Sequence, residues 1–467
     1  MLIVPEADWI CVVGVCYDFY EKFRPQLDAE PKRRLVFLDI HGEASSFPHA
    51  QVYVYSGLTQ QEMNDAAKKI GWKSVFQTVA VLDLAGVGNR AGQFEKSLLQ
   101  HKEAAHLLLS DWADAGESVL KHALSHWRSL PEVRSGLCLK NRFKGIPAII
   151  CGGGPSLKKN AHLLDREKAL IFAGGAALNQ LPIEPHFAAS IDREAPFSLF
   201  KCHSFWQTPF FYQSRMSPQN FSLLHGEKCY VPDGSYPAEA WFAGEDLFDG
   251  GWTVGTFLAS MAVLLGCDPI VYVGMDLCYE GNKKYAFCKE SALKDGLITT
   301  LDREGKLVWT QRDWVMAAHW ISELAAKRWD RTFINATEGG VAVSPQVQVR
   351  GLKDVLDSWT YEMDLLGLVH SEIMGLEVMP IPLDKIEEWQ KSLKTCLTFC
   401  KKSLKKQVHV AWDREIVYQK LLYPLWQIWS PIFERELDVD AQPLPLEEKM
   451  RLNQILFFQR VLYEQAN

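Results

Sequence analysis

The sequence has no apolar run long enough to cross a lipid bilayer. Its longest run of this kind, "VGTFLASMAVLLGC" from Val254 to Cys267, is shorter than the roughly 20 residues that a transmembrane helix needs. The first residues include acidic side chains and no basic segment, which is not typical of a secretory signal peptide. We therefore expect a soluble protein without a transmembrane segment, located in the cytoplasm.

The sequence also lacks a basic excess and any metal-binding cysteine pattern. Its 467 residues include 50 basic and 57 acidic side chains, for a net charge of -7. This balance argues against nucleic acid as a partner. The 11 cysteines form no CxxC pair and show no metal-ligand spacing against histidines, as expected of reduced core residues. A chain of this length predicts several domains.

The pattern of apolar residues divides the chain into four segments. Strand-like and helix-like runs alternate in two of them, and the other two have helical spacing without a strand pattern. We predict a small α/β domain at 1–92, a helical linker at 93–140, a Rossmann-like central domain with a mostly parallel sheet at 141–352, and a C-terminal helical domain at 353–467. Pro424 and Pro431 predict breaks or kinks in one C-terminal helix. The predicted fold class is α/β.

The stretch "PAIICGGGPSL" carries the first functional signal. An apolar strand ends at Cys151, and Gly152, Gly153 and Gly154 then leave bare backbone that a ligand could approach closely. Pro155 suits the first turn of a helix, and Ser156 with the amides of that turn could bind an anion. No Gly-Lys-Ser/Thr follows, and the dinucleotide glycine pattern is incomplete. The stretch predicts a phosphate site without identifying the nucleotide.

Three further strands end in residues that suit a binding site. The strand "ALIFAGG" ends at Gly174 and leads to Asn179, "HFAASIDRE" leads to Asp192 and Arg193, and "DPIVYVGMD" leads to Asp276. Because ligands of parallel sheets bind outside the carboxyl ends of the strands, we expect one cleft. A later turn, "INATEGG", adds the hydroxyl of Thr337, the carboxylate of Glu338 and the bare backbone of Gly339 and Gly340.

These motifs resemble, in order and spacing, the family of 6-hydroxymethylpterin diphosphokinase-like domains. That family includes the bacterial motility accessory factor (Maf) proteins, which are regarded as glycosyltransferases that add nonulosonic acids to flagellin. The resemblance covers roughly Asn141 to Leu352, and the layout of the whole chain is more similar to the Maf proteins than to the compact archaeal enzymes. It implies that Gly152 to Ser156 contact a nucleotide phosphate, and that Asn179, Asp192 and the turn from Thr337 to Gly340 surround the nucleotide or the acceptor.

Two positions depart from the pattern of that family. Lys158 replaces a frequent aspartate, and Tyr285 stands where Maf-like proteins carry a histidine suited to acid–base work. A tyrosine, with a reference pKa of about 10, is a poor general base. Either Asp276 takes that role, or another group such as His319 does, or the protein binds without turnover. Asp276, Tyr285 and Arg193 are the catalytic candidates.

Three functions remain open at this stage. The favoured one is a glycosyltransferase that uses a nucleotide-activated sugar such as a CMP-nonulosonate and needs no metal. The alternative is a diphosphokinase that transfers pyrophosphate from ATP, with Mg²⁺ held by Asp192 and Asp276. The third is a nucleotide-binding scaffold without catalysis. The expected partners are a nucleotide or nucleotide-sugar, a protein acceptor, and a second copy of the chain bound through the C-terminal helices.

Overall fold

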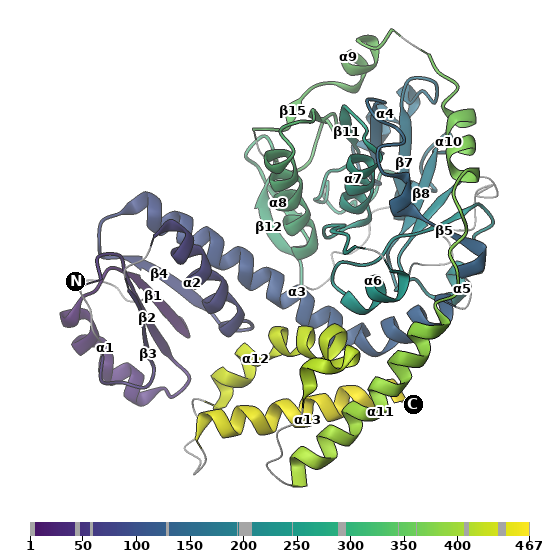
Figure 1. The fold of residues 1–467 in the computed structure, drawn as a ribbon. Coiled ribbons are helices and arrows are strands. Elements are labelled where there is room, and N and C mark those ends of the chain that lie inside the picture. Colours follow the sequence, from purple (N-terminus) through teal and green to yellow (C-terminus); the bar gives the residue numbers. More distant parts are fainter. Residues whose placement is uncertain are drawn as a thin grey trace. The chain divides into compact units, whose positions relative to one another are not determined.

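The computed structural model divides the chain into two compact units. It describes residues 5–42, 47–56, 59–127, 130–193, 195, 208–244, 246–287, 296–343, 345–360, 362–405, 411–437 and 445–466. One unit comprises residues 1–114 and 392–467, and the other comprises residues 115–391. Each unit contains a parallel sheet (Figure 1).

The first unit is built around a four-stranded parallel sheet in the order β3-β2-β1-β4. Its strands are β1 (Trp9–Val13), β2 (Arg34–Asp39), β3 (Val52–Ser56) and β4 (Val79–Asp83). Side chains alternate between the two faces of β1. Trp9 and Cys11 pack with α2 (Gln60–Lys73) and the start of α3 (Gly88–Trp127), whereas Ile10 and Val12 pack with α1 (Tyr17–Ala29). The predicted α/β layer at the start of the chain is confirmed.

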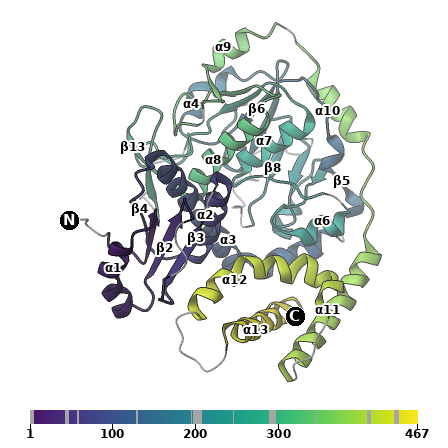
Figure 2. The same cartoon turned by 60° about the vertical axis from the view of Figure 1, so that its left-hand side comes forward.

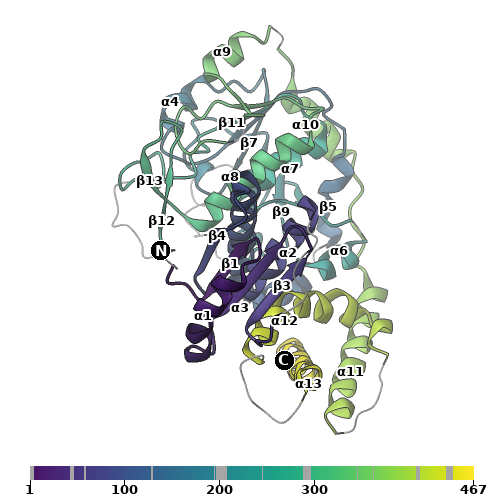
Figure 3. The ribbon, with the colours of Figure 1, turned by 90° about the vertical axis from the view of Figure 1, so that its left-hand side faces the viewer.

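The C-terminal helices contact this layer through α12. They are α11 (Leu383–Lys405), α12 (Tyr423–Leu437) and α13 (Leu446–Ala466), with α12 and α13 side by side (Figure 3). Arg435 on α12 donates hydrogen bonds of 2.8 Å to the carbonyl oxygens of Lys73 and Val75 at the end of α2. Lys73 also forms a 2.7 Å ion pair with Glu434. Most of the segment that we predicted as a separate helical domain therefore shares a compact unit with the N-terminal layer.

One of the two expected proline effects differs in the structure. A π-helical turn, Tyr418–Leu422, directly precedes α12, so the irregularity expected near Pro424 is present. Pro424 is the second residue of α12 and follows this π-helical turn directly. Pro431, in contrast, lies inside α12, which continues through it to Leu437. The helix does not end at Pro431.

The second unit contains a nine-stranded sheet in the order β15-β14-β11-β6-β7-β8-β9-β10-β5, in which every recorded pairing is parallel. The strands are β5 (Val133–Ser135), β6 (Ala148–Cys151), β7 (Leu170–Gly174), β8 (Phe187–Ser190), β9 (Phe210–Tyr212), β10 (Lys228–Tyr230), β11 (Ile270–Val273), β14 (Phe333–Asn335) and β15 (Gln348–Val349). A separate antiparallel hairpin joins β12 (Ile298–Leu301) and β13 (Leu307–Thr310). The predicted parallel central sheet is confirmed, although β5 begins before residue 141.

Helices surround this sheet. They are α4 (Leu157–Asn160), α5 (Pro218–Phe221), α6 (Pro237–Ala243), α7 (Val254–Leu265), α8 (Arg312–Lys327), α9 (Leu352–Asp357) and α10 (Leu365–Met374), with short 3₁₀ turns at Leu130–Glu132, Gly136–Leu139, Ala161–Leu163, Gly175–Ala177 and, in the first unit, Trp412–Arg414. The apolar helix α7 packs against β6, β7 and α8 (Figure 2). Its hydrophobic composition thus reflects burial in the core. Among the residues described, no helix is long and apolar enough to span a membrane.

The order of the strands creates a reversal point between β6 and β11. From β6 the chain builds β7, β8, β9 and β10 on one side, and it then crosses back to form β11 on the other side of β6. The chain leaves β6 toward β7 and leaves β11 toward β14, on the opposite side of the sheet. The carboxyl ends of β6 and β11 therefore flank an opening between them. In open α/β sheets, ligands bind at such a point.

Candidate functional site

A cavity of about 340 Å³ opens at this reversal point. Its walls come from the glycine turn after β6, the end of β7, Asp192 after β8, the first turn of α7, the segment after β11, and the start of α8. Segments far apart in the chain therefore meet at the carboxyl edge of the sheet. The single cleft predicted at this edge is present in the structure.

The cavity brings together about half of the site residues predicted from the sequence. Those that line it are Gly152, Gly153, Gly154, Gly174, Asp192, Asp276 and Tyr285. Those outside its lining, as far as the structure describes it, are Pro155, Ser156, Asn179, Arg193, Thr337, Glu338 and Gly339. His319 on α8 also lies outside the lining.

The glycines after β6 serve close packing of the backbone. A Cβ on Gly152 would collide with the carbonyl oxygen of Gly274, and a Cβ on Gly274 would collide with that of Gly152. A Cβ on Gly153 would lie 3.0 Å from the Cβ of Ala176, and one on Gly154 would overlap the carboxylate of Asp276. Protein atoms therefore fill much of the space that we predicted for a phosphate.

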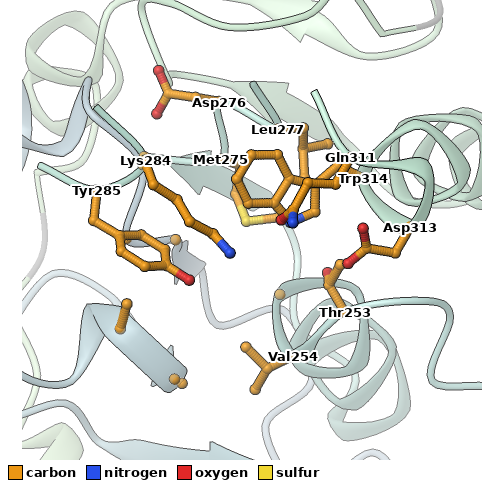
Figure 4. Close-up of a pocket in the computed structure, with 18 of the residues that line it drawn as sticks. Thr253, Val254, Met275, Asp276, Leu277, Lys284, Tyr285, Gln311, Asp313 and Trp314 are labelled. Carbon is orange, nitrogen blue, oxygen red and sulfur yellow. The ribbon is translucent and has the colours of Figure 1, made fainter. Parts of the chain in front are cut away.

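Asp276 occupies the anion position that we predicted beside Ser156. Its Oδ2 accepts hydrogen bonds from the Ser156 hydroxyl at 2.8 Å and from the Ser156 amide at 3.2 Å. Burial raises the pKa of Asp276 to about 6, although the hydrogen bonds from Ser156 act in the opposite direction. In Figure 4 the carboxylate of Asp276 lies apart from the Lys284 nitrogen and the Tyr285 hydroxyl. The anion at this turn is thus the protein's own side chain.

The TEGG turn after β14 encloses Asp276 from the other side. Gly340 has φ +77°, and a Cβ there would collide with the backbone of Asp276. The Thr337 hydroxyl accepts a 3.3 Å hydrogen bond from the amide of Met275, and the carbonyl of Glu338 accepts a 2.7 Å bond from Lys159. These contacts tie together the turns that follow β6, β11 and β14. The turn supports the cavity wall without lining it.

The N-terminus of α7 is a feature that our sequence reasoning missed. Thr253 and Thr256 form a capping box, in which the Thr253 hydroxyl accepts a 3.3 Å bond from the Thr256 amide. The amides of Val254 and Gly255 lie in the first turn, where helical N–H groups have no intrahelical partner, and both residues line the cavity. Such a helix end favours an anion. The pattern T-x-x-T before an apolar run was the available signal.

Lys284 provides the one basic side chain among the residues that line the described cavity. Its ammonium lies 5.2 Å from the ring centroids of both Tyr285 and Trp314, within the range of cation–π attraction. Figure 4 shows Lys284 and Tyr285 on one side of the cavity and Asp313 and Trp314 on the other. No motif marks Lys284, Asp313 or Trp314 in the sequence, so only their convergence in the fold identifies them.

Two carboxylates accompany this lysine. Asp192 is exposed at the mouth of the cavity, and the protein atoms packed around it still raise the pKa of its carboxyl, against the charges of Arg215 and Lys284. Burial likewise raises the pKa of Asp313, Lys284 again opposes it, and Asp192 adds to it. The cavity therefore holds carboxylates that bind protons more readily than usual, beside a cation.

The residues predicted to hold Mg²⁺ fit that role poorly. Asp276 has its carboxylate engaged by Ser156, and Mg²⁺ would have to displace these hydrogen bonds to use it as a ligand. Within the described part of the chain, no group of three or more His, Cys, Asp or Glu side chains could hold a metal ion. The pair Asp192 and Asp276 does not form a ready site for the ion.

Comparisons with known proteins agree with the resemblance seen in the sequence. A family model described as 6-hydroxymethylpterin diphosphokinase MptE-like matches residues 121–282. The structure of a Maf glycosyltransferase from Magnetospirillum magneticum AMB-1 is similar with a TM-score of 0.55 and 13% sequence identity, covering 98% of this chain and 74% of that chain. No curated protein matches the sequence. The structural likeness establishes a shared fold, and the resemblance predicted from the motifs is confirmed.

Proposed function

We propose that this chain is a transferase that binds a nucleotide-activated sugar in the cavity and transfers the sugar to an acceptor. The observation that carries this proposal is the arrangement at the reversal point of the sheet. There the first turn of α7 and Lys284 face the same cavity as Asp192 and Asp313. One part of the cavity suits a phosphate, and the carboxylates suit a proton transfer.

The phosphate subsite consists of the Val254 and Gly255 amides with Lys284. Helix-terminal amides and an ammonium group both stabilise the negative charge that builds on a departing phosphate. The rings of Trp252, Tyr285 and Trp314 supply apolar walls for a nucleobase or a sugar ring. This differs from our expectation that Gly152 to Ser156 would contact the phosphate.

The match to the diphosphokinase family model supports a second candidate, the transfer of pyrophosphate from ATP. That reaction needs Mg²⁺ to neutralise the triphosphate. Because the Ser156 hydroxyl donates a hydrogen bond to the carboxylate of Asp276, Asp192 would have to bind Mg²⁺ together with a ligand other than Asp276. We therefore rank this reaction second.

A ligand-dependent thermal shift tests the proposal. The panel is CMP, CDP, UDP, GDP, ATP, and ATP with Mg²⁺, because a ligand of the native state adds about 2.7 kcal/mol of stability at 100 times its Kd. We expect a pyrimidine nucleotide to raise Tm without a metal. Lys284→Met should remove most of this shift, whereas Lys283→Met, its neighbour outside the cavity lining, should keep it.

Each other outcome has a definite meaning. A shift with ATP that requires Mg²⁺ would support the diphosphokinase. A protein that gives no shift with any nucleotide of the panel would contradict both reactions. Equal shifts in the two lysine variants would contradict the assignment of the phosphate subsite.

A further inference from the structure

We infer that Asp313 is the catalytic base of the transfer, and this inference rests on the proposed function. The residue is outside the motifs of the sequence, and the fold brings it to the cavity. It lies in the first turn of α8, a helix of 16 residues. Figure 4 shows its carboxylate directed into the cavity, opposite Lys284.

The alternatives are less suited to this role. The carboxylate of Asp276 accepts hydrogen bonds from Ser156 and lies apart from the Lys284 nitrogen. The phenol of Tyr285 has too high a reference pKa, about 10, to act as a base near neutral pH, and its ring contacts the ammonium of Lys284. A catalytic group also works best when a rigid element holds it. Asp313 is on such an element, whereas Asp192 is on a loop.

The surroundings of Asp313 suit proton transfer. Burial raises its pKa, which makes the carboxylate a stronger base than an ordinary aspartate. The charge of Lys284 and the backbone N–H groups of the first turn lower that pKa in part, and the charge of Asp192 raises it. The helix dipole of α8 also favours the ionised form. Lys284 thus has two roles: it is a positioning residue that keeps Asp313 ionised, and it contacts the phosphate.

The step balances as follows for a sugar donor. Asp313 takes the proton of the acceptor hydroxyl while the acceptor oxygen forms a bond to the anomeric carbon. The bond between that carbon and the phosphate oxygen breaks, and its electron pair stays on the phosphate. The α7 amides and Lys284 stabilise the phosphate that leaves. Asp313 then releases the proton to solvent.

The experiment measures donor consumption by the full chain. The probes are CMP-N-acetylneuraminate and UDP-N-acetylglucosamine with water as the acceptor, each followed by release of its nucleotide over a range of pH. General base catalysis contributes about 10²–10⁴-fold, so Asp313→Asn should lower kcat at least 100-fold with little change in KM. Asp313→Ser is the second variant, since a hydroxyl keeps a hydrogen-bonding oxygen in the first turn of α8. Glu323→Gln, an exposed acidic position on the same helix, is the matched control.

The pH profile separates catalysis from a structural role. Because Lys284 lowers the pKa of Asp313, Lys284→Met should move the acid limb of the kcat profile to higher pH. If the parent consumes a donor and both Asp313 variants keep kcat within about threefold of it, far from the 10²-fold effect of a lost base, Asp313 is not the base. If the parent binds a nucleotide but consumes neither donor, the proposed sugar transfer fails, and this inference fails with it.

Discussion

The burial of Asp276 predicts a pH-dependent loss of stability that the substitution Asp276→Asn should remove. The side chain is 5% exposed, and its pKa rises from 3.8 to about 6 on folding. Between these two values the folded state binds more protons than the unfolded state. Stability therefore falls as pH rises through this window, and it is level above about pH 6.

The size of this loss follows from the two pKa values. One unit of pKa corresponds to 1.36 kcal/mol, so the change from 3.8 to about 6 costs about 3 kcal/mol. Asparagine has nearly the same shape and carries no charge at any pH. The Asp276→Asn variant should therefore lack the destabilisation that ionisation causes. It should also lose the charge-assisted hydrogen bonds from Ser156, which are worth about 1.5–3 kcal/mol.

Thermal unfolding of the parent and Asp276→Asn at about pH 4 and about pH 7 measures the effect. For a domain of this size, 1 kcal/mol corresponds to roughly 2 °C in Tm. The difference in Tm, variant minus parent, should therefore be roughly 5 °C larger at the higher pH than at the lower one. A difference in Tm that stays constant with pH would refute the burial of an ionisable carboxylate between the turns after β6 and β14.

Three further predictions concern stability and metal dependence. Gly340→Ala should lower Tm more than Gly281→Ala. Both glycines have positive φ, but only a Cβ on Gly340 would collide with Asp276. Equal losses of Tm in thermal unfolding would contradict this packing. Burial and the charge of Asp233 raise the pKa of Glu239 well above its usual 4.5. The parent should therefore lose stability as pH rises above that value, whereas Glu239→Gln should not, and urea unfolding curves across the range measure the loss. Nucleotide binding measured by calorimetry should survive EDTA, and binding that appears only when Mg²⁺ is restored would favour the diphosphokinase.

The sequence predicted the architecture well because strands and strand ends leave local signals. Apolar runs identified β6, β7, β8 and β11, and the parallel arrangement placed their carboxyl ends at one edge. Gly152, Gly174, Asp192 and Asp276 accordingly line one cavity. The long-range pairing of α12 with α2 has no such signal, because it depends on single contacts such as that of Arg435 with Lys73.

The site was harder to predict because its chemistry depends on what fills each space. A glycine turn has the same sequence whether a phosphate or a carboxylate lies against it. Here Asp276, which is 120 residues from Ser156 in the chain, takes the position. Lys284 comes from the irregular segment after β11, and Asp313 comes from the first turn of α8. The fold brings these two segments to the same cavity. No short sequence pattern predicts that Lys284 and Asp313 lie in the same cavity.

Hydrogen–deuterium exchange with and without saturating CMP, in EDTA, tests the central claim most directly. Bound nucleotide should slow exchange in peptides that contain the first turn of α7, Lys284 and the start of α8, because these segments line the cavity. Peptides from β1 to β4 should be unchanged and serve as the internal control. Protection at the cavity segments is the result that we predict. Unchanged exchange there, or protection confined to the four-stranded sheet, would contradict a nucleotide site at the reversal point between β6 and β11.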